Sequence, residues 1–369
     1  MNKSRVYFTN FRTTLEENVQ QKLARLMATA GMDQIDFDGK FVAIKMHFGE
    51  PGNLAFLRPN FARTVADFVK SAGGRPFLTD CNTLYIGGRK NALDHLDSAN
   101  MNGFLPVTTG CQILIADGLK GTDDVHVPVS GGEYVKEAKI GRAVMDADVF
   151  ISLTHFKGHE NVCFGGALKN IGMGCGSRAG KMEMHSAGKP YVEQDACIGC
   201  GACAKICAHD APRITDGKCA VNHDKCVGCG RCIAVCPTDA MRSPFDESFA
   251  ILGAKIAEYA KAVMDGRPCF HITIANAISP NCDCHAENDA PIVPDIGMFA
   301  SFDPVALDQA CIDAVNRQTR LPNTFIDDYG DQSLADTFRA AHPDTDWRST
   351  IEHARKLGLG TDEYELITV

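Results

Sequence analysis

The chain reads CIGCGACAKIC over residues 197–207 and CVGCGRCIAVCP over residues 226–237, and this stretch decides how the rest is organised. Each cysteine of the first run recurs 29 residues later in the second run. The flanking residues repeat as well, since Gly199 and Gly201 recur as Gly228 and Gly230. The stretch is therefore an internal duplication that supplies two matched sets of four cysteines.

The spacing of these cysteines is that of bacterial-type proteins with two [4Fe–4S] clusters. Three thiolates at intervals of three let a tight loop wrap one face of a cluster, and the fourth cysteine reaches the other cluster. Zinc is the alternative, but zinc sites use two separated pairs of cysteines rather than two evenly spaced quartets. Ala208 stands where the second run has Pro237, which leaves the ligands intact. The spacing assigns Cys197, Cys200, Cys203 and Cys236 to one cluster, and Cys226, Cys229, Cys232 and Cys207 to the other.

Residues 189–244 around these cysteines are predicted to form a small ferredoxin-type module. Its few apolar residues make only a thin core, and domains of this size usually depend on bound metal. We therefore expect cluster binding to supply much of the folding free energy of the module.

The composition of the chain is that of an ordinary globular protein. It has 369 residues, of which 45% are hydrophobic and 22% are charged. The formal net charge of −9 argues against nucleic acid or an anionic membrane as a main partner. The first residues contain no apolar signal core, and no run approaches the length of a membrane span. With 17 cysteines, the expected location is a reducing cytoplasm, without oxygen.

Strands and helices are predicted to alternate on both sides of the module, which is typical of a mostly parallel α/β sheet with flanking helices. An α/β core domain of residues 1–188 and 245–369 is thus interrupted by residues 189–244. Residues 125–129 and 133–140 are expected to form a hairpin at the sheet edge, and the chain beyond residue 317 to form covering helices. The predicted strands lie at residues 5–11, 40–48, 77–80, 112–117, 149–154, 270–278 and 291–301, and the main helices at residues 14–30, 59–71, 89–100, 247–264 and 304–317.

Four predicted strands end in polar groups that are able to bind a metal or a cofactor. Because the carboxyl ends of parallel strands lie at one edge of a sheet, where open α/β sheets bind ligands, we expect one site there. Each such residue alone is more often structural, so the prediction depends on the four groups occurring together. The groups are His47, Glu50 and Asn53; Asp80, Asn82 and Thr83; His155, Lys157 and His159; and Asn281, Cys282, Asp283 and Cys284.

Two sets of candidate residues follow from these strand ends and from the glycine-rich stretch that begins at Gly165. That stretch is able to bring backbone amides close to a cofactor. It is not a P-loop, because no Ser or Thr follows its Gly-Lys pair, and it lacks the last glycine of the dinucleotide pattern. The candidate catalytic residues are His155, Lys157, His159, Cys282 and Cys284, and the candidate cofactor-binding residues are His47, Asn53, Gly165, Gly166, Lys169 and Asn170.

Several stretches resemble the domain-of-unknown-function 362 family, iron–sulfur proteins whose core domain often carries a ferredoxin insert. The likeness covers nearly the whole chain and implies a redox protein with an inserted module and a second site, without naming a substrate. The matching stretches are KMHFGEPGN (residues 45–53), HFKGH (155–159), GGALKNIGMGC (165–175), SPNCDC (279–284), DIG (295–297) and SFDPVALD (301–308).

Three hypotheses about function remain open at this point. The first is an oxidoreductase whose two clusters pass single electrons to a cofactor, metal or substrate at the strand-end site, with a redox partner protein. The second is an electron carrier whose α/β domain only docks a partner enzyme. The third is a metal- or cluster-handling protein that uses Cys282, Cys284 and the histidines to hold and release a metal. A further metal or an organic cofactor and the oligomeric state are left open.

Overall fold

A computed structural model describes residues 3–186 and 188–369. At its centre is a sheet of eight strands. In chain order these are β1 (Ser4–Thr9), β2 (Phe41–Lys45), β3 (Arg75–Asp80), β4 (Gln112–Ile115), β7 (Val149–His155), β14 (Cys269–Ala275), β15 (Gly297–Ser301) and β16 (Tyr364–Thr368).

The strands of this sheet are arranged in the order β16-β1-β15-β14-β7-β2-β3-β4. β15 runs antiparallel to both of its neighbours, whereas every other neighbouring pair is parallel. The predicted α/β sheet is confirmed in a mixed form, mostly parallel with one reversed strand.

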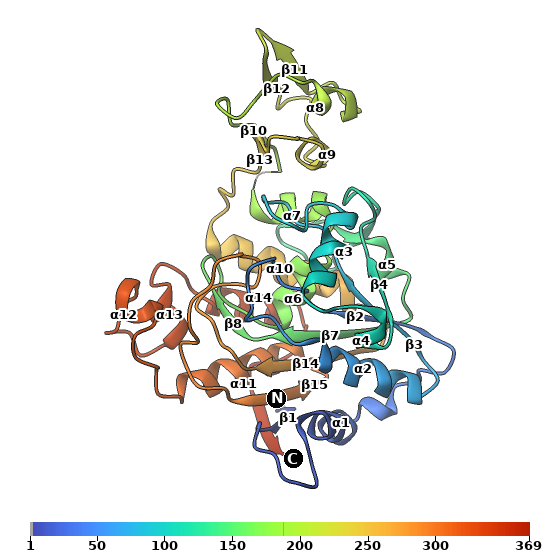
Figure 1. Ribbon diagram of the computed structural model, residues 1–369, viewed down its shortest axis with the longest axis vertical. Helices are drawn as coiled ribbons and strands as arrows, with labels where there is room; N and C mark the ends of the chain where they lie inside the picture. The colour runs from blue at the N-terminus through green and yellow to red at the C-terminus, as the bar shows by residue number, and fades with distance from the viewer. Residues whose placement is uncertain (1–2, 187) are drawn as a thin grey trace.

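Helices cover both faces of the sheet. The side chains of Val42 and Ile44 in β2 pack in a core with α1 (Val19–Thr29) and α2 (Pro59–Ser71). Ala43, between them, packs in a second core with α6 (Ala167–Cys175), α10 (Phe249–Met264) and α11 (Pro304–Asn316). This alternation is the two-residue period of a strand that is buried on both faces. Figure 1 shows α1 and α2 on one side of the sheet and α10 on the other.

The remaining elements are short. Among the described helices, none is both long and apolar enough to cross a membrane. Outside residues 189–244 these elements are η1 (Met32–Gln34), α3 (Ala92–Met101), α4 (Pro106–Thr109), β5 (Asp124–Pro128), β6 (Glu137–Gly141), α5 (Arg142–Met145), β8 (Lys157–His159), β9 (Cys163–Gly165), α7 (Arg178–His185), α12 (Phe325–Tyr329), α13 (Thr337–Ala341) and α14 (Arg348–Lys356).

Three details differ from the sequence predictions. The first helix begins at Val19 rather than at residue 14, because Asn18 and Gln21 form a reciprocal capping box. The hairpin of β5 and β6 forms a two-stranded sheet of its own rather than the edge of the large sheet. The chain beyond residue 317 includes β16, which pairs with β1. Its residues are exposed or half-buried, so no buried apolar run marked it in the sequence.

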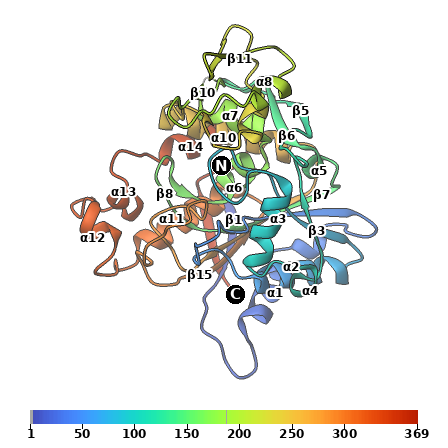
Figure 2. The same cartoon turned by 45° about the horizontal axis from the view of Figure 1, so that its top comes forward.

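The cysteine-rich segment, residues 189–244, contains two antiparallel pairs of short strands and two short helices. β10 (Tyr191–Val192) pairs with β13 (Met241–Arg242), and β11 (Pro212–Thr215) pairs with β12 (Lys218–Val221). α8 (Ala202–Ile206) and α9 (Arg231–Ala234) occupy equivalent places in the two cysteine runs, and the φ angles of the glycines before them are 74° and 65°. The segment projects from one end of the molecule, far from both termini (Figure 1), and comes toward the viewer in Figure 2.

The cysteine-rich segment is packed against the α/β part of the chain. Leu84 and Met182 share a small buried core with Ile233 and Met241 of the segment. An ion pair joins Lys90, which precedes α3, to Asp239 of the segment. These contacts fix the segment above the edge of the sheet where several parallel strands end.

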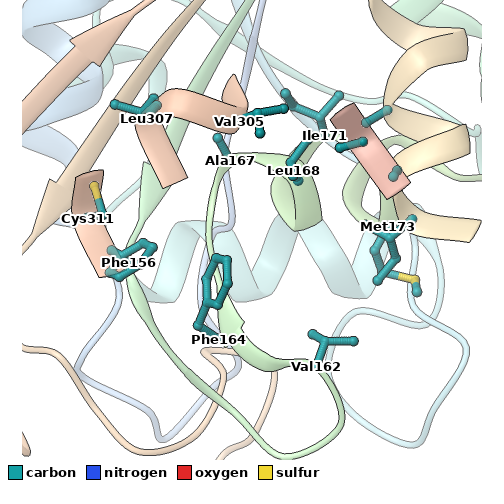
Figure 3. Packing of buried hydrophobic residues seen from close by; sticks show 14 of the residues in the cluster. Phe156, Val162, Phe164, Ala167, Leu168, Ile171, Met173, Val305, Leu307 and Cys311 are labelled. Carbon is teal, nitrogen blue, oxygen red and sulfur yellow. The ribbon is translucent and has the colours of Figure 1, made fainter. Parts of the chain in front are cut away.

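The loop and helix that follow β9 are anchored by close packing. Figure 3 shows Leu168 and Ile171 of α6 among Val305, Leu307 and other buried side chains. Leu168 is 1% exposed, whereas Leu15 is fully exposed. We expect Leu168→Ala to lower the free energy of unfolding by about 2–5 kcal/mol, because the substitution leaves a cavity.

The matched control is Leu15→Ala, which should change the free energy of unfolding by no more than about 0.5 kcal/mol. Urea denaturation followed by circular dichroism measures both. Equal losses in the two variants would show that α6 does not pack as described.

Candidate functional site

Four strand ends meet at one edge of the sheet. β14, β7, β2 and β3 are neighbours in this order and are parallel, so their carboxyl ends lie side by side. A cavity of about 580 Å³ lies at this edge. The strand-end residues that line it include Lys45, His47, Glu50, Asp80, Lys157, His159, Glu160, Lys169, Asn170, Cys282, Cys284 and His285.

A buried ion pair forms the floor of the cavity between β2 and β3. The ammonium of Lys45 lies 3.0 Å from a carboxylate oxygen of Asp80 and donates to the side-chain oxygen of Asn170 at 2.8 Å. Burial opposes the charge of Asp80, but Lys45 and other nearby cations hold the pKa of this carboxyl below its usual value. A side chain at Gly174 would overlap the Lys45 ammonium, so the glycine makes room for it. Asp80 is therefore held as a carboxylate that is paired with the ammonium of Lys45.

Arg89 contacts two residues of the loop that follows β2. Its Nε donates to Glu50 at 2.7 Å, and its Nη1 lies 2.7 Å from Nε2 of His47. An arginine only donates, and the N–H of Gly49 donates to Nδ1 at 3.0 Å, so both ring nitrogens of His47 face donors. Burial, followed by the charge of Arg89, lowers the pKa of His47 well below its usual value. His47 therefore faces the cavity as a neutral imidazole.

His155 and Lys157 share the carboxylate of Asp283. Nδ1 of His155 lies 2.8 Å from Asp283, and its Nε2 lies 2.8 Å from the carbonyl oxygen of Asn276. The ammonium of Lys157 lies 3.3 Å from the other oxygen of Asp283. Both ring nitrogens of His155 are thus held by structural partners, and this histidine lies behind the cavity wall. Lys157 lines the cavity.

Cys282, Cys284 and His159 form a compact group of donor atoms. One ring nitrogen of His159 and the two sulfurs lie within 4.8 Å of one another. The Lys169 ammonium lies 2.9 Å from the sulfur of Cys282. The hydrogen bond from Cys284, together with Lys169, holds the pKa of Cys282 well below its usual value, and the same hydrogen bond raises the pKa of Cys284. The pair therefore behaves as one thiolate and one thiol.

Glu160 and His285 form an ion pair at the rim. Nε2 of His285 lies 3.1 Å from Oε1 of Glu160. This contact raises the pKa of His285 to about 9. Burial disfavours the Glu160 carboxylate, but His159 and His285 lower its pKa to about 2. Both residues are charged at neutral pH, beside the sulfur of Cys284.

The cysteine-rich segment supplies the opposite wall of the same cavity. Tyr191, Ile233, Asp239, Met241 and Arg242 line it together with the strand-end residues. The cavity therefore lies between two parts of the chain that are distant in sequence.

Two small cavities within the segment are lined by cysteines. They contain the two quartets that the spacing assigned, including the exchange of the fourth cysteine between the runs. Cys219, which the sequence gave no reason to single out, also lines the first, with its sulfur 3.5 Å from that of Cys203. The first cavity is lined by Cys197, Cys200, Cys203 and Cys236, and the second by Cys207, Cys226, Cys229 and Cys232.

The structure brings most of the predicted strand-end residues to the large cavity. Asn53 and Gly165 do not line it, and neither does His155. Asn53 instead donates to the carbonyl oxygen of His285 at 3.0 Å and so holds two loops together. The predicted residues that do line the cavity are His47, Glu50, Asp80, Thr83, Lys157, His159, Gly166, Lys169, Asn170, Cys282 and Cys284, whereas Asn82, Asn281 and Asp283 do not.

Sequence reasoning gave no role to Lys45, Arg89 or Glu160. Lys45 is the last residue of β2, and Glu160 follows His159 directly. Their positions next to predicted site residues could have indicated them. Arg89 lies outside every predicted strand end. Only the fold brings it to Glu50 and His47.

Fold and site together define an α/β protein with a charged cavity at its strand ends, enclosed by a cysteine-rich segment. The chain belongs to the family described as "Domain of unknown function (DUF362)", whose model matches residues 42–313. This match runs from β2 into α11 and includes all four strand ends of the site.

Individual relatives are more distant. A thylakoid-associated protein of Synechocystis sp. is 29% identical over 131 residues, which are 34% of this chain and 35% of that protein. The chain thus matches only about a third of the length of this relative.

Two solved structures are similar to this chain at low sequence identity. The lactate racemase apoprotein from Thermoanaerobacterium thermosaccharolyticum is 11% identical with a TM-score of 0.32, over 73% of this chain and 50% of that chain. A protein from Thermotoga maritima is 10% identical with a TM-score of 0.40, over 83% and 60%. Both scores are too low to support an assignment of fold or function.

The Lys45–Asp80 pair provides a test of the cavity floor. Asp80→Ala leaves the buried ammonium of Lys45 without its carboxylate, and we expect the free energy of unfolding to fall by about 3–5 kcal/mol. The matched control is Asp67→Ala, which breaks the exposed pair with Arg63 and should cost less than about 1 kcal/mol. Chemical denaturation measures both. Similar losses would mean that the Lys45–Asp80 pair is not buried as described.

Proposed function

We propose that the chain is an iron–sulfur redox protein. The eight cysteines of the two quartets hold two [4Fe–4S] clusters, and the strand-end cavity holds the cofactor, metal or substrate that exchanges electrons with them. The proposal rests above all on one observation, that strand ends and cysteine-rich segment line the same cavity. A redox partner protein and a cytoplasmic location belong to the proposal, as expected from the cysteines and the sequence.

The donor groups around the two small cavities fit such clusters. Each cavity is lined by one quartet of cysteines, the donor set of a [4Fe–4S] cluster, and the first cavity by Cys219 as well. Gly199 and Gly228 occupy equivalent places in the two runs with φ of 64° and 70°, and a side chain at either would meet a backbone carbonyl. The duplicated sequence thus has a duplicated backbone conformation. Bound clusters of this kind accept and release one electron at a time.

The two quartets differ in their contacts with the rest of the chain. Met241 lines both that cavity and the small cavity of Cys197, Cys200, Cys203 and Cys236. Among the described residues, none lines both the strand-end cavity and the cavity of the second quartet. The first quartet therefore adjoins the cavity through Met241, whereas the run of the second quartet packs on α7, where Gly230 lies against Arg178.

The cavity and its buried charges favour an enzyme over a carrier. A protein that only docks a partner needs an exposed surface, whereas this chain builds a cavity of about 580 Å³ with buried charges. Lys157 and Lys169 place two ammonium groups on its wall, where they are able to stabilise negative charge that develops on a reduced group. Lys157 is also a candidate proton donor, since it lies next to the cavity without a cysteine partner.

Metal and sulfide analysis of protein purified without oxygen tests the cluster assignment. We expect roughly eight irons per chain, and an electron paramagnetic resonance signal after reduction. Cys200→Ala and Cys229→Ala should each lose iron from one quartet. Cys282→Ala is the matched control and should keep all of the iron, because Cys282 lies in neither small cavity. Zinc in place of iron in the quartets would refute the assignment.

A second experiment separates enzyme from carrier. The purified protein is mixed with a reduced viologen and with pooled small-molecule fractions of a cell extract, and the oxidation of the viologen is followed. If the chain is an enzyme, Cys282→Ala and His155→Ala abolish the oxidation while the iron stays in place, because Cys282 lines the cavity and His155 positions Asp283 and Lys157. Unchanged oxidation of the reduced clusters by ferricyanide shows that the clusters of each variant still exchange electrons. A carrier would keep its reactivity with a partner protein in both variants.

A further inference from the structure

We propose that His159, Cys282 and Cys284 form a third metal site, apart from the two cysteine quartets, that holds one late first-row divalent ion such as zinc. The inference rests on the proposed function in one respect, since it places the ion at the wall of the cavity where that function locates the chemistry. Its ligands are argued from the contacts of the three residues.

The three donor atoms have the chemistry and the spacing of such a site. Thiolate and imidazole are the ligands that zinc and its neighbours prefer, and two cysteines with one histidine leave a fourth position open, as in catalytic zinc sites. Zinc–ligand distances of ~2.0–2.3 Å require donor atoms about 3.3–3.8 Å apart. The three atoms lie within 4.8 Å of one another, so a small movement of side chains brings them into contact with one ion.

The backbone holds the ligands side by side. His159 lies in β8, opposite Cys163 of β9. The loop that carries the two cysteines is joined to β8 by the hydrogen bond from the N–H of Gly158 to the carbonyl oxygen of Ser279, at 2.8 Å. A side chain at Gly158 would overlap the carbonyl of Pro280, so this close approach needs the glycine.

Two neighbouring groups are placed to support a bound ion. Lys169 approaches the sulfur of Cys282 from within the protein and offsets the negative charge that a second thiolate would add. Oε2 of Glu160 is buried, has no hydrogen-bond partner among the described residues, and lies 3.4 Å from Nδ1 of His159. A metal-bound histidine usually donates its second N–H to such a carboxylate.

This arrangement specifies how His159 binds. Its Nδ1 accepts the backbone N–H of Asn161 at 3.0 Å, which leaves Nε2 for the ion. Binding through Nε2 moves the ring proton to Nδ1, so the bond from the Asn161 N–H is given up and Oε2 of Glu160, 3.4 Å from Nδ1, becomes the acceptor. His155 is unsuited to the same role, since Asp283 and Asn276 hold both of its nitrogens.

The test uses the full chain with its iron in place, purified without oxygen. Zn²⁺ is added, unbound metal is removed, and zinc and iron are measured in the same samples. We expect one zinc per chain in the unmodified protein with no loss of iron. Cys282→Ser, Cys284→Ser and His159→Gln should each weaken zinc binding at least 100-fold, and Glu160→Gln 10- to 100-fold.

Matched controls are Cys269→Ser and His126→Gln, which lie outside the cavity and should bind zinc like the unmodified protein. Co²⁺ in place of Zn²⁺ should give thiolate-to-cobalt absorption that both cysteine variants reduce. Unfolding curves recorded without zinc check the folding of each variant. Because Glu160→Gln retains all three ligands, its weaker binding remains informative if a ligand variant does not fold.

The outcomes separate this inference from the proposed function. No zinc in the unmodified protein, with about eight irons present, overturns the third site and leaves the cluster assignment intact. Zinc retained equally by Cys282→Ser, or lost with Cys229→Ala instead, also overturns it. Zinc bound through His159 and the two cysteines in a protein whose quartets take up no iron would support the site and refute the proposed function.

Discussion

The parallel hydrogen bonding of β14, β7, β2 and β3 is the constraint on which the rest of the structure depends. It brings four strand ends to one edge, and each end delivers charged or sulfur-containing side chains to a buried place. A buried charge without a partner is strongly destabilising. The loops therefore have to satisfy one another across the edge, and the pairs Lys45–Asp80, Arg89–Glu50 and Lys157–Asp283 do so. The cavity remains open because its polar walls are fixed by these pairs.

The same constraint explains why residues with similar chemistry have different roles. His155 and His159 are four residues apart and both lie at the end of β7 or just beyond it. Asp283 and Asn276 hold both nitrogens of His155, whereas His159 reaches Cys282 and Cys284. Asp283 lies between these two cysteines in a turn that the N–H of His285 closes on the carbonyl oxygen of Cys282 at 3.1 Å, and its carboxylate contacts His155. One short loop thus supplies an anchor on one side and two sulfurs on the other.

Much of this arrangement was predictable from the sequence because it depends on local spacing. The cysteine quartets follow from their period, and the convergence of His47, Lys157 and Cys282 follows from apolar strands that end in polar residues. Arg89 and Met241 were beyond such reasoning, since they reach the cavity only through tertiary contacts with no local pattern. The reversed direction of β15 and the exposed edge strand β16 were missed for a related reason. Strand direction and edge pairing depend on partners that are remote in the chain.

Met241 separates the cysteine-lined interior of the segment from the charged cavity by the thickness of one side chain. Together with Ile233, Leu84 and Met182 it forms a small buried apolar core. This core keeps water away from that side of the cavity, where water would screen the charges of the lysines and carboxylates. The electrostatic strength of the cavity is therefore a property of the segment as well as of the sheet. Any event that loosens the cysteine-rich segment would hydrate the cavity and weaken every charge interaction within it, even with the strand ends unchanged.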